Sequence, residues 1–206
     1  MPHPWEEVPL NAYEGHMQLA GIEQMQSLNA LMQQRIAAYP ASSVAVWGVA
    51  GGNGLEHIDP KTVQAVYGVD VNVQYLAACR ERHPQLIEKL TLLCADLSKP
   101  CEHLPHAELV IADLFIEYIG IPAFAGRVRE CNPKYLCCVI QKNISAAFVS
   151  DSPYMQALSG IGELHTDVEE EALTSAMPAS YRLLYREEIP LPNGKLFIRL
   201  DFMRRD

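Results

Sequence analysis

The chain has 206 residues, of which 49% are hydrophobic and 20% are charged, which is typical of one globular domain with a substantial core. Its 16 lysines and arginines oppose 25 aspartates and glutamates, giving a formal net charge of −9. This charge repels a phosphate backbone and argues against nucleic acid as a partner. The sequence has no secretory signal pattern and no apolar run long enough to span a bilayer, so we expect a cytoplasmic protein without membrane contact.

The six cysteines form no Cys-x-x-Cys pair. Cys137 and Cys138 are adjacent inside an apolar run, and in a strand they would point to opposite faces of the sheet. This spacing favours buried thiols and predicts no metal site.

The first predicted element is helical. Residues 11–38 carry apolar side chains at helical spacing, and Gly21 divides the stretch into two pieces. Residues 44–49 (VAVWGV) are an apolar run that predicts a short buried strand. Four glycines follow within seven positions, namely Gly48, Gly51, Gly52 and Gly54. They predict a tight turn that a ligand approaches closely, with a helix beginning near Gly54.

Apolar runs and helical patterns alternate after this turn. Further strands are predicted at 65–71, 90–97, 107–115 and 134–143. Helices are predicted over 73–83, from about Glu117, and over 167–177. Asn72 is the expected cap of the first of these helices, and Thr166 or Asp167 that of the last. The runs 181–191 and 195–203 are joined through Pro-Asn-Gly, which indicates a hairpin.

This order predicts an α/β fold with a doubly wound, mainly parallel Rossmann-like sheet and an antiparallel hairpin at one edge. The first four strands end at Gly48, Asp70, Asp96 and Asp113. Ligands of open α/β sheets bind beyond the carboxyl ends of the strands, so we expect these residues to converge on one crevice.

Two common nucleotide motifs are absent from the glycine loop. The dinucleotide pattern G-x-G-x-x-G fails because His57 stands at the third glycine place after Gly52 and Gly54. A phosphate-binding G-x-x-x-x-G-K-[ST] loop is also missing. Asp70 at the end of a strand nevertheless suits a ribose diol, so an NAD-dependent oxidoreductase stays a less favoured alternative.

Four segments in order, VAVWGVAGGNG, VYGVDVN, LLCADL and AELVIADLFIEYI, resemble the cofactor half of class I S-adenosylmethionine-dependent methyltransferases. The resemblance runs from about residue 42 to the end of the chain. It implies a seven-stranded sheet, S-adenosylmethionine as cofactor, and a methyltransferase domain over 41–206 behind an N-terminal helical lid over 1–40. It also implies methyl transfer by in-line displacement, with a small-molecule acceptor as the default.

The resemblance assigns roles to the strand ends. Gly48 stands where the family has an acid that orders the loop and holds the cofactor's amino group, so another group must do this here. Asp70 matches the ribose-binding acid, Asp96 with Leu97 matches the pair that reads the adenine edge, and Asp113 with Leu114 lies beside the methionine part. The cofactor-binding set implied is Tyr13, Gly48, Ala50, Gly52, Asn53, Gly54, Asp70, Val71, Asp96, Leu97, Asp113 and Leu114.

The predicted N-terminal helix supplies candidates for the acceptor side. Tyr13 and His16 are three residues apart and share one helix face. Tyr13 is expected to reach the cofactor carboxylate, and His16 is the candidate general base if the acceptor must lose a proton. The alternative is that Tyr13 packs in the core and His16 is solvated. The acceptor-binding set predicted here is Trp5, His16, Tyr118, Gln141 and Asn143.

Other functions of proteins with this type of sheet agree less well with the sequence. Base-methylating relatives carry Asn/Asp-Pro-Pro-Tyr/Phe after the fourth strand, where this chain has DLFIEY. An aminopropyltransferase would have an acid in the glycine loop and more aspartates after the fourth strand. A non-catalytic protein that binds an adenosyl cofactor, or that only interacts with a partner, is the second class of hypothesis. We expect a monomer or a homodimer.

Overall fold

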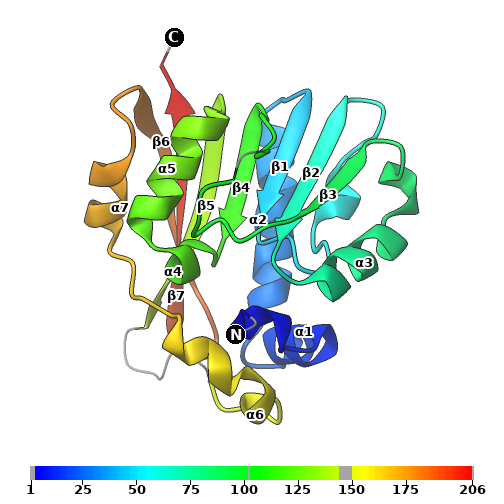
Figure 1. Ribbon diagram of the computed structural model, residues 1–206. Helices are drawn as coiled ribbons and strands as arrows, with labels where there is room; N and C mark the ends of the chain where they lie inside the picture. Colours follow the sequence, from blue (N-terminus) through cyan, green and yellow to red (C-terminus); the bar gives the residue numbers. More distant parts are fainter. Residues whose placement is uncertain (1–2, 102, 144–149, 206) are drawn as a thin grey trace.

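Seven strands form one twisted sheet with helices on both faces in the computed structural model of the protein (Figure 1). The structure describes residues 3–101, 103–143 and 150–205. The strand order is β3-β2-β1-β4-β5-β7-β6. Strands β1 to β5 are parallel, and β7 runs antiparallel to both β5 and β6. The predicted fold class, with its antiparallel closing hairpin, is therefore confirmed.

All seven strands lie where the apolar runs predict them, although several are shorter than expected. They are β1 (Ser43–Trp47), β2 (Ala65–Asp70), β3 (Leu90–Cys94), β4 (Leu109–Asp113), β5 (Tyr135–Asn143), β6 (Tyr181–Pro190) and β7 (Lys195–Arg204). The end of β3 at Cys94 leaves Asp96 in the following turn, two residues beyond the strand.

The helices of the described residues begin with two that Gly21 separates, with a φ of +85° at this glycine. They are α1 (Leu10–Gln18), α2 (Gln24–Ala38), α3 (Val73–Arg82), α4 (Ile116–Ile119), α5 (Ile121–Cys131), α6 (Met155–Leu158) and α7 (Glu170–Ala176). Short 3-10 turns are η1 (Pro4–Glu6), η2 (Leu55–His57), η3 (Pro84–Leu86) and η4 (Ser159–Glu163). As predicted, Asn72 caps α3, because its side chain accepts from the N–H groups of Gln74 and Tyr75.

Two expectations about helix ends are wrong. The helix expected near Gly54 is only the 3-10 turn η2, because Asp59 and Pro60 follow and proline disfavours helical geometry in the residue before it. Helix α7 has Glu169 at its N-cap, with no side-chain cap hydrogen bond, instead of Thr166 or Asp167. The N–H and hydroxyl of Thr166 both donate to the carbonyl oxygen of Glu117, which holds this segment against α4.

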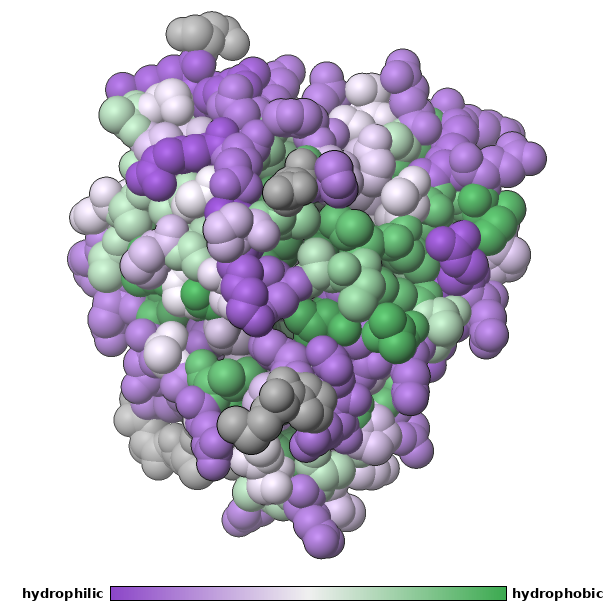
Figure 2. Space-filling view, viewed as in Figure 1, coloured by the Kyte–Doolittle hydropathy of each residue, from purple (hydrophilic) through white to green (hydrophobic). Residues whose placement is uncertain are grey.

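Helices cover both faces of the sheet. Helices α5 and α7, in front in Figure 1, pack Phe124, Val128 and Leu173 on one face, while α2 and α3 cover the other. The adjacent Cys137 and Cys138 pack in the two opposite clusters, as predicted. The connection from β3 to β4 crosses the front face, and Figure 2 shows apolar side chains gathered in this part of it. In the described part of the chain, no helix is long and apolar enough to cross a bilayer.

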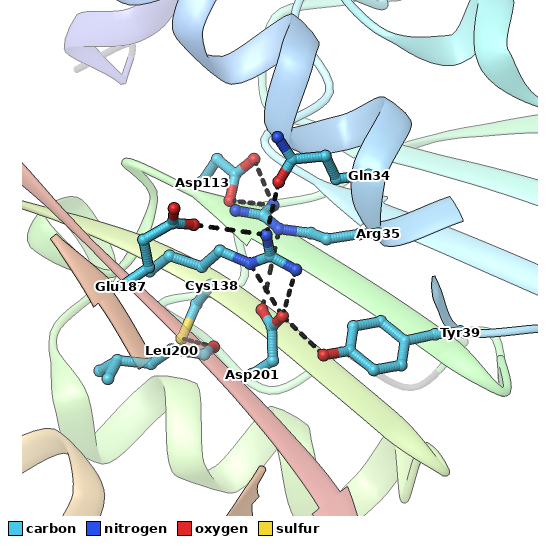
Figure 3. Close-up of polar contacts among 9 residues, drawn as sticks. Gln34, Arg35, Tyr39, Asp113, Cys138, Glu187, Leu200 and Asp201 are labelled. Atoms are coloured by element: carbon cyan, nitrogen blue, oxygen red, sulfur yellow. Dashed lines mark hydrogen bonds and ion pairs between the residues drawn. The ribbon is translucent and has the colours of Figure 1, made fainter. Parts of the chain in front are cut away.

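A buried ion-pair network ties α2 to the sheet (Figure 3). The Arg35 side chain is 0% exposed, and its Nη1 donates to both carboxylate oxygens of Asp113, at 2.7 and 2.8 Å. Its Nε lies 3.8 Å from Oδ1 of Asp201, whose Oδ2 accepts from the Tyr39 hydroxyl and from Arg199. Burial alone would lower the Arg35 pKa, but the carboxylates of Asp113 and Asp201 raise it, so the guanidinium stays charged.

Replacing Arg35 should destabilise the protein strongly. Arg35→Met leaves the Asp113 carboxylate without its cation and leaves Asp201 with Arg199 alone, so we expect the free energy of unfolding to fall by about 3–5 kcal/mol. Gln33→Met, at an exposed position of the same helix, should change it by less than about 0.5 kcal/mol. Urea unfolding of both variants measures the difference. Equal stability of Arg35→Met and the wild type would contradict a structural role for the network.

Candidate functional site

A cavity opens at the carboxyl ends of β1, β2 and β4, with about 1090 Å³ of unfilled space up to and including its open mouth. Most of the predicted site residues line it. They are Trp5, Tyr13, His16, Gly48, Ala50, Asp70, Val71, Asp96, Leu97, Asp113, Leu114, Tyr118 and Gln141. The predicted residues Gly52, Asn53, Gly54 and Asn143 are not among its lining residues.

Only the first part of the glycine loop forms a wall of the cavity. Gly48 has a φ of +74°, and a Cβ at this position would lie 2.8 Å from Cδ2 of Phe115. The aromatic ring therefore occupies the space that a side chain on the loop would need. Gly54, with a φ of +90°, instead allows the loop to pack against Met32 of α2. Close packing of the loop on α2, and not a ligand, is the reason for this last glycine.

Two carboxylates hold the turns that border the cavity. Asp70 accepts from the N–H of Ala50 at 3.0 Å and from the N–H of Asn72 at 2.9 Å, which joins the glycine loop to the end of β2. Burial raises the pKa of Asp70. Asp96 accepts from the N–H of Ser98 at 3.0 Å and pairs with Lys99 at 2.8 Å. Burial opposes ionisation of Asp96, but hydrogen bonds from Lys99 and Ser98 lower its pKa below the ordinary value.

The end of β4 carries Asp113, whose charge is offset by Arg35, and Leu114, whose backbone conformation is strained. Asp113 lines the cavity, but both of its oxygens accept from Arg35. Leu114 follows with a φ of +50°, which is uncommon for a residue with a side chain. Its N–H donates to the carbonyl oxygen of Val139, so pairing with β5 holds this conformation. Such strain is concentrated at functional sites.

The N-terminal segment closes the cavity with aromatic rings. Trp5 packs edge-on against Tyr118 and Tyr13, with ring centroids 4.9 and 5.6 Å apart. The Asn72 amide donates to the carbonyl oxygen of Trp5 at 2.9 Å, and the Tyr75 hydroxyl donates to that of Val8 at 2.9 Å. The segment before α2 therefore lies over the cavity, whereas α2 itself packs on the sheet.

His16 and Gln141, which are predicted to bind the acceptor, both line the cavity. Nδ1 of His16 lies 2.8 Å from the Ser152 hydroxyl. Burial, with a smaller contribution from Lys195, lowers the pKa of His16, so the imidazole is neutral at neutral pH. The Gln141 amide donates to Asn143 at 2.8 Å and accepts from the Gln24 amide.

Glu117 of α4 also lines the cavity, although the sequence indicated only that a helix begins near it. It is 1% exposed. Its Oε1 accepts from the backbone N–H of Gln141 at 2.8 Å, whereas its Oε2 has no hydrogen-bond partner among the described residues. Burial raises the pKa of Glu117 to about 7, and Asp113 and Asp167 add to this effect. Its position shortly after the fourth strand, at the start of α4, is the only signal in the sequence.

The cavity as a whole is acidic. Four carboxyl groups line it, those of Asp70, Asp96, Asp113 and Glu117, and no lysine or arginine is among its described lining residues. The buried guanidinium of Arg35, which does not line the cavity, offsets the charge of Asp113. The arrangement favours ligands that carry a net positive charge and donate hydrogen bonds, and disfavours phosphates and other net anions.

Comparison with known proteins identifies the fold. No protein-family model and no curated protein matches the sequence. Magnesium protoporphyrin IX methyltransferase from Synechocystis PCC 6803, solved with bound S-adenosylmethionine, aligns with a TM-score of 0.62 at 11% identity, over 87% of this chain and 79% of that one. The [4+2]-cyclase SpnF aligns with a TM-score of 0.64 at 11% identity, over 87% and 81% of the two chains. A putative RNA methyltransferase from Pyrococcus horikoshii aligns with a TM-score of 0.54 at 14% identity, over 88% and 81%.

This chain therefore has the fold of class I S-adenosylmethionine-dependent methyltransferases. The activities named for these proteins differ from one another, so the fold alone does not identify the acceptor.

The buried carboxyl of Glu117 should make stability depend on pH. A carboxyl whose pKa rises from 4.5 to about 7 on folding destabilises the folded state once it must ionise, so stability is lost as the pH rises from 4.5 to 7. Glu117→Gln should increase the free energy of unfolding by on the order of 3 kcal/mol at pH 8, and by less than about 1 kcal/mol at pH 5.

Glu163→Gln, which removes the same charge from an exposed position in η4, is the matched control and should change stability little at either pH. Urea unfolding at the two pH values makes the comparison. A gain for Glu117→Gln that is equal at both would contradict the raised pKa.

Proposed function

We propose that this protein is an S-adenosylmethionine-dependent methyltransferase that acts on a small-molecule acceptor. The observation that carries the proposal is one cavity in which the bare backbone at Gly48 adjoins the carboxylates of Asp70 and Asp96. The fold supports it, because a protein of the same fold is solved with this cofactor bound.

The chemistry of the cavity fits this cofactor. The Asp70 carboxylate accepts from backbone N–H groups, and its two oxygens have about four lone-pair sites in all, so it can still accept from a ribose diol. Asp96 and the N–H of Leu97 would bind the adenine edge. Gly48 and Ala50 would lie along the methionine part, which Tyr13 covers from the other side. The acidic lining complements the sulfonium and amino charges of the cofactor.

S-adenosylmethionine, when bound, would supply a methyl group attached to a sulfonium, with a neutral thioether as its leaving group. The protein then has to align the acceptor and exclude water, and alignment of this kind supplies roughly 7–11 kcal/mol. The aromatic cluster of Trp5, Tyr13 and Tyr118 is the group proposed to exclude water. His16 stays a candidate base for an acceptor that must lose a proton.

A small molecule is the acceptor class that the electrostatics favour. Carboxylates line the cavity, and the chain carries a net charge of −9, so phosphate-rich polymers are repelled. The apolar part of the lining, which includes Leu158 and Ile161, suits a compact organic body.

The second candidate is a protein that binds an adenosyl ligand without methyl transfer. It is favoured by the missing acid at Gly48, where Phe115 fills the space of a side chain, and by a cyclase of the same fold. An aminopropyltransferase and an NAD-dependent oxidoreductase are less favoured, because the loop lacks the residues that each of them would use.

Ligand binding tests the proposal. S-adenosylhomocysteine at 100 times its dissociation constant should stabilise the protein by about 2.7 kcal/mol in thermal unfolding. Asp70→Asn removes a carboxylate oxygen from the proposed diol site and should weaken binding by about 1–3 kcal/mol. Asp59→Asn, on an exposed turn, is the control and should leave affinity unchanged.

Stabilisation by NAD alone would instead support the oxidoreductase. Unchanged affinity in Asp70→Asn, measured by titration calorimetry, would contradict the proposed ribose site. Binding without release of S-adenosylhomocysteine from S-adenosylmethionine across a panel of amine, phenol and thiol acceptors would favour the non-catalytic alternative.

A further inference from the structure

Resting on the proposed function, we infer that Glu117 is the acid–base residue of the acceptor end, and that the acceptor is an amine that enters as an ammonium ion. Glu117 belongs to neither the ribose nor the adenine part of the proposed cofactor site. Its carboxyl group is therefore free to recognise the second substrate.

The backbone around Glu117 holds its carboxyl group in one position. Oε1 accepts from the Gln141 N–H at 2.8 Å, and the carbonyl oxygen of Glu117 accepts from the N–H and hydroxyl of Thr166 at 2.8 and 3.0 Å. Strand β5 and the segment before α7 thus fix the residue from two sides. Oε2 is buried and has no hydrogen-bond partner among the described residues. A buried acceptor atom of this kind is costly unless a ligand supplies the donor.

The charges that act on Glu117 come from several elements. Asp113 on β4, already paired with Arg35, and Asp167 before α7 both disfavour its ionisation. Gln141 on β5 contributes a hydrogen bond that favours the ionised form. Tyr118 is the adjacent residue of α4, and His16 of α1 lines the same cavity. A ligand cation would reverse the balance, because an opposite charge at hydrogen-bond distance favours the carboxylate.

The walls near Glu117 favour an amine with an apolar body. Trp5 and Tyr118 stack edge to face, and Leu158 and Ile161 complete the lining with hydrophobic surface. Aromatic faces attract an ammonium group, whereas the acidic lining repels an acceptor that carries a carboxylate or a phosphate.

The proton transfer balances within the site. An N–H bond of the ammonium breaks and its electron pair stays on nitrogen, while the proton forms an O–H bond with Oε2. The products are a neutral carboxylic acid, which burial favours, and a neutral amine with the lone pair that a methyl acceptor needs. With its pKa raised to about 7, Glu117 is close to the best match for this role near neutral pH.

Titration calorimetry with a defined probe tests the inference without methyl transfer. The wild type and Glu117→Gln are saturated with S-adenosylhomocysteine and titrated with 2-phenylethylamine, or with 2-phenylethanol as the neutral control. We expect the amine to bind about 10- to 100-fold more weakly to Glu117→Gln, because a charge-assisted hydrogen bond is lost. The alcohol should bind both proteins alike, and Glu163→Gln should behave as the wild type.

Proton release gives a readout that a purely structural role would not move. At pH 7 about half of the free Glu117 carboxyls carry a proton, and the ammonium probe displaces it, so binding releases protons into the buffer. Repeating the titration in buffers of different ionisation enthalpy should detect this release in the wild type and none in Glu117→Gln. In the wild type alone, amine affinity should rise between pH 6 and pH 8.

Each outcome is decisive. Equal amine affinity in the wild type and Glu117→Gln, or no amine binding to a wild type that does bind S-adenosylhomocysteine, would overturn the inference and leave the proposed function standing. A wild type that fails to bind S-adenosylhomocysteine would overturn the proposed function itself. If Glu117→Gln does not fold, a flat pH dependence of amine affinity in the wild type overturns the inference.

Discussion

The placement of one guanidinium group organises this molecule. Arg35 is carried by α2 into the interior, where it binds Asp113 in two hydrogen bonds and lies beside Asp201. These carboxylates come from β4 and β7, so the contact fixes the helix against the centre of the sheet and not against its edge. A buried charge of this kind is tolerated only when its partners are present, which makes the arrangement specific as well as costly to break.

The same contact sets the electrostatics of the cavity. Arg35 on α2 donates to both oxygens of Asp113. The positive charge of the guanidinium therefore offsets the negative charge of this carboxylate at the end of β4. Asp70 accepts hydrogen bonds from backbone amides, and Asp96 is paired with Lys99. Asp70, Asp96 and Asp113 are thus tied to the scaffold, whereas Glu117 keeps one carboxylate oxygen with no partner among the described residues.

The sequence predicts those features of the structure that depend on residues close together in the chain. Continuous apolar runs located all seven strands, Asn72 marked the start of α3, and Gly21 marked the break before α2, because each depends on neighbouring residues. The helix expected after Gly54 failed because Pro60 ends it, and the glycine itself serves packing against Met32. The sequence could not assign roles to Arg35 and Glu117. Their partners, Asp113 and the backbone N–H of Gln141, are distant in the sequence and form no recognisable motif with them. Arg199 and Asp201, two residues apart in an apolar strand, were the one overlooked sign of a buried network.

The proposed function requires that an adenosyl ligand binds in the cavity, and a crystal structure of the protein with S-adenosylhomocysteine tests this most directly. The ribose hydroxyls should lie within hydrogen-bond distance of Asp70, the adenine should lie beside Asp96 and Leu97, and Gly48 should face the homocysteine part. The sulfur should point toward the end that Glu117 and Tyr118 line. A ligand bound elsewhere on the protein, with the cavity blocked by Trp5 and Tyr13, would contradict the account.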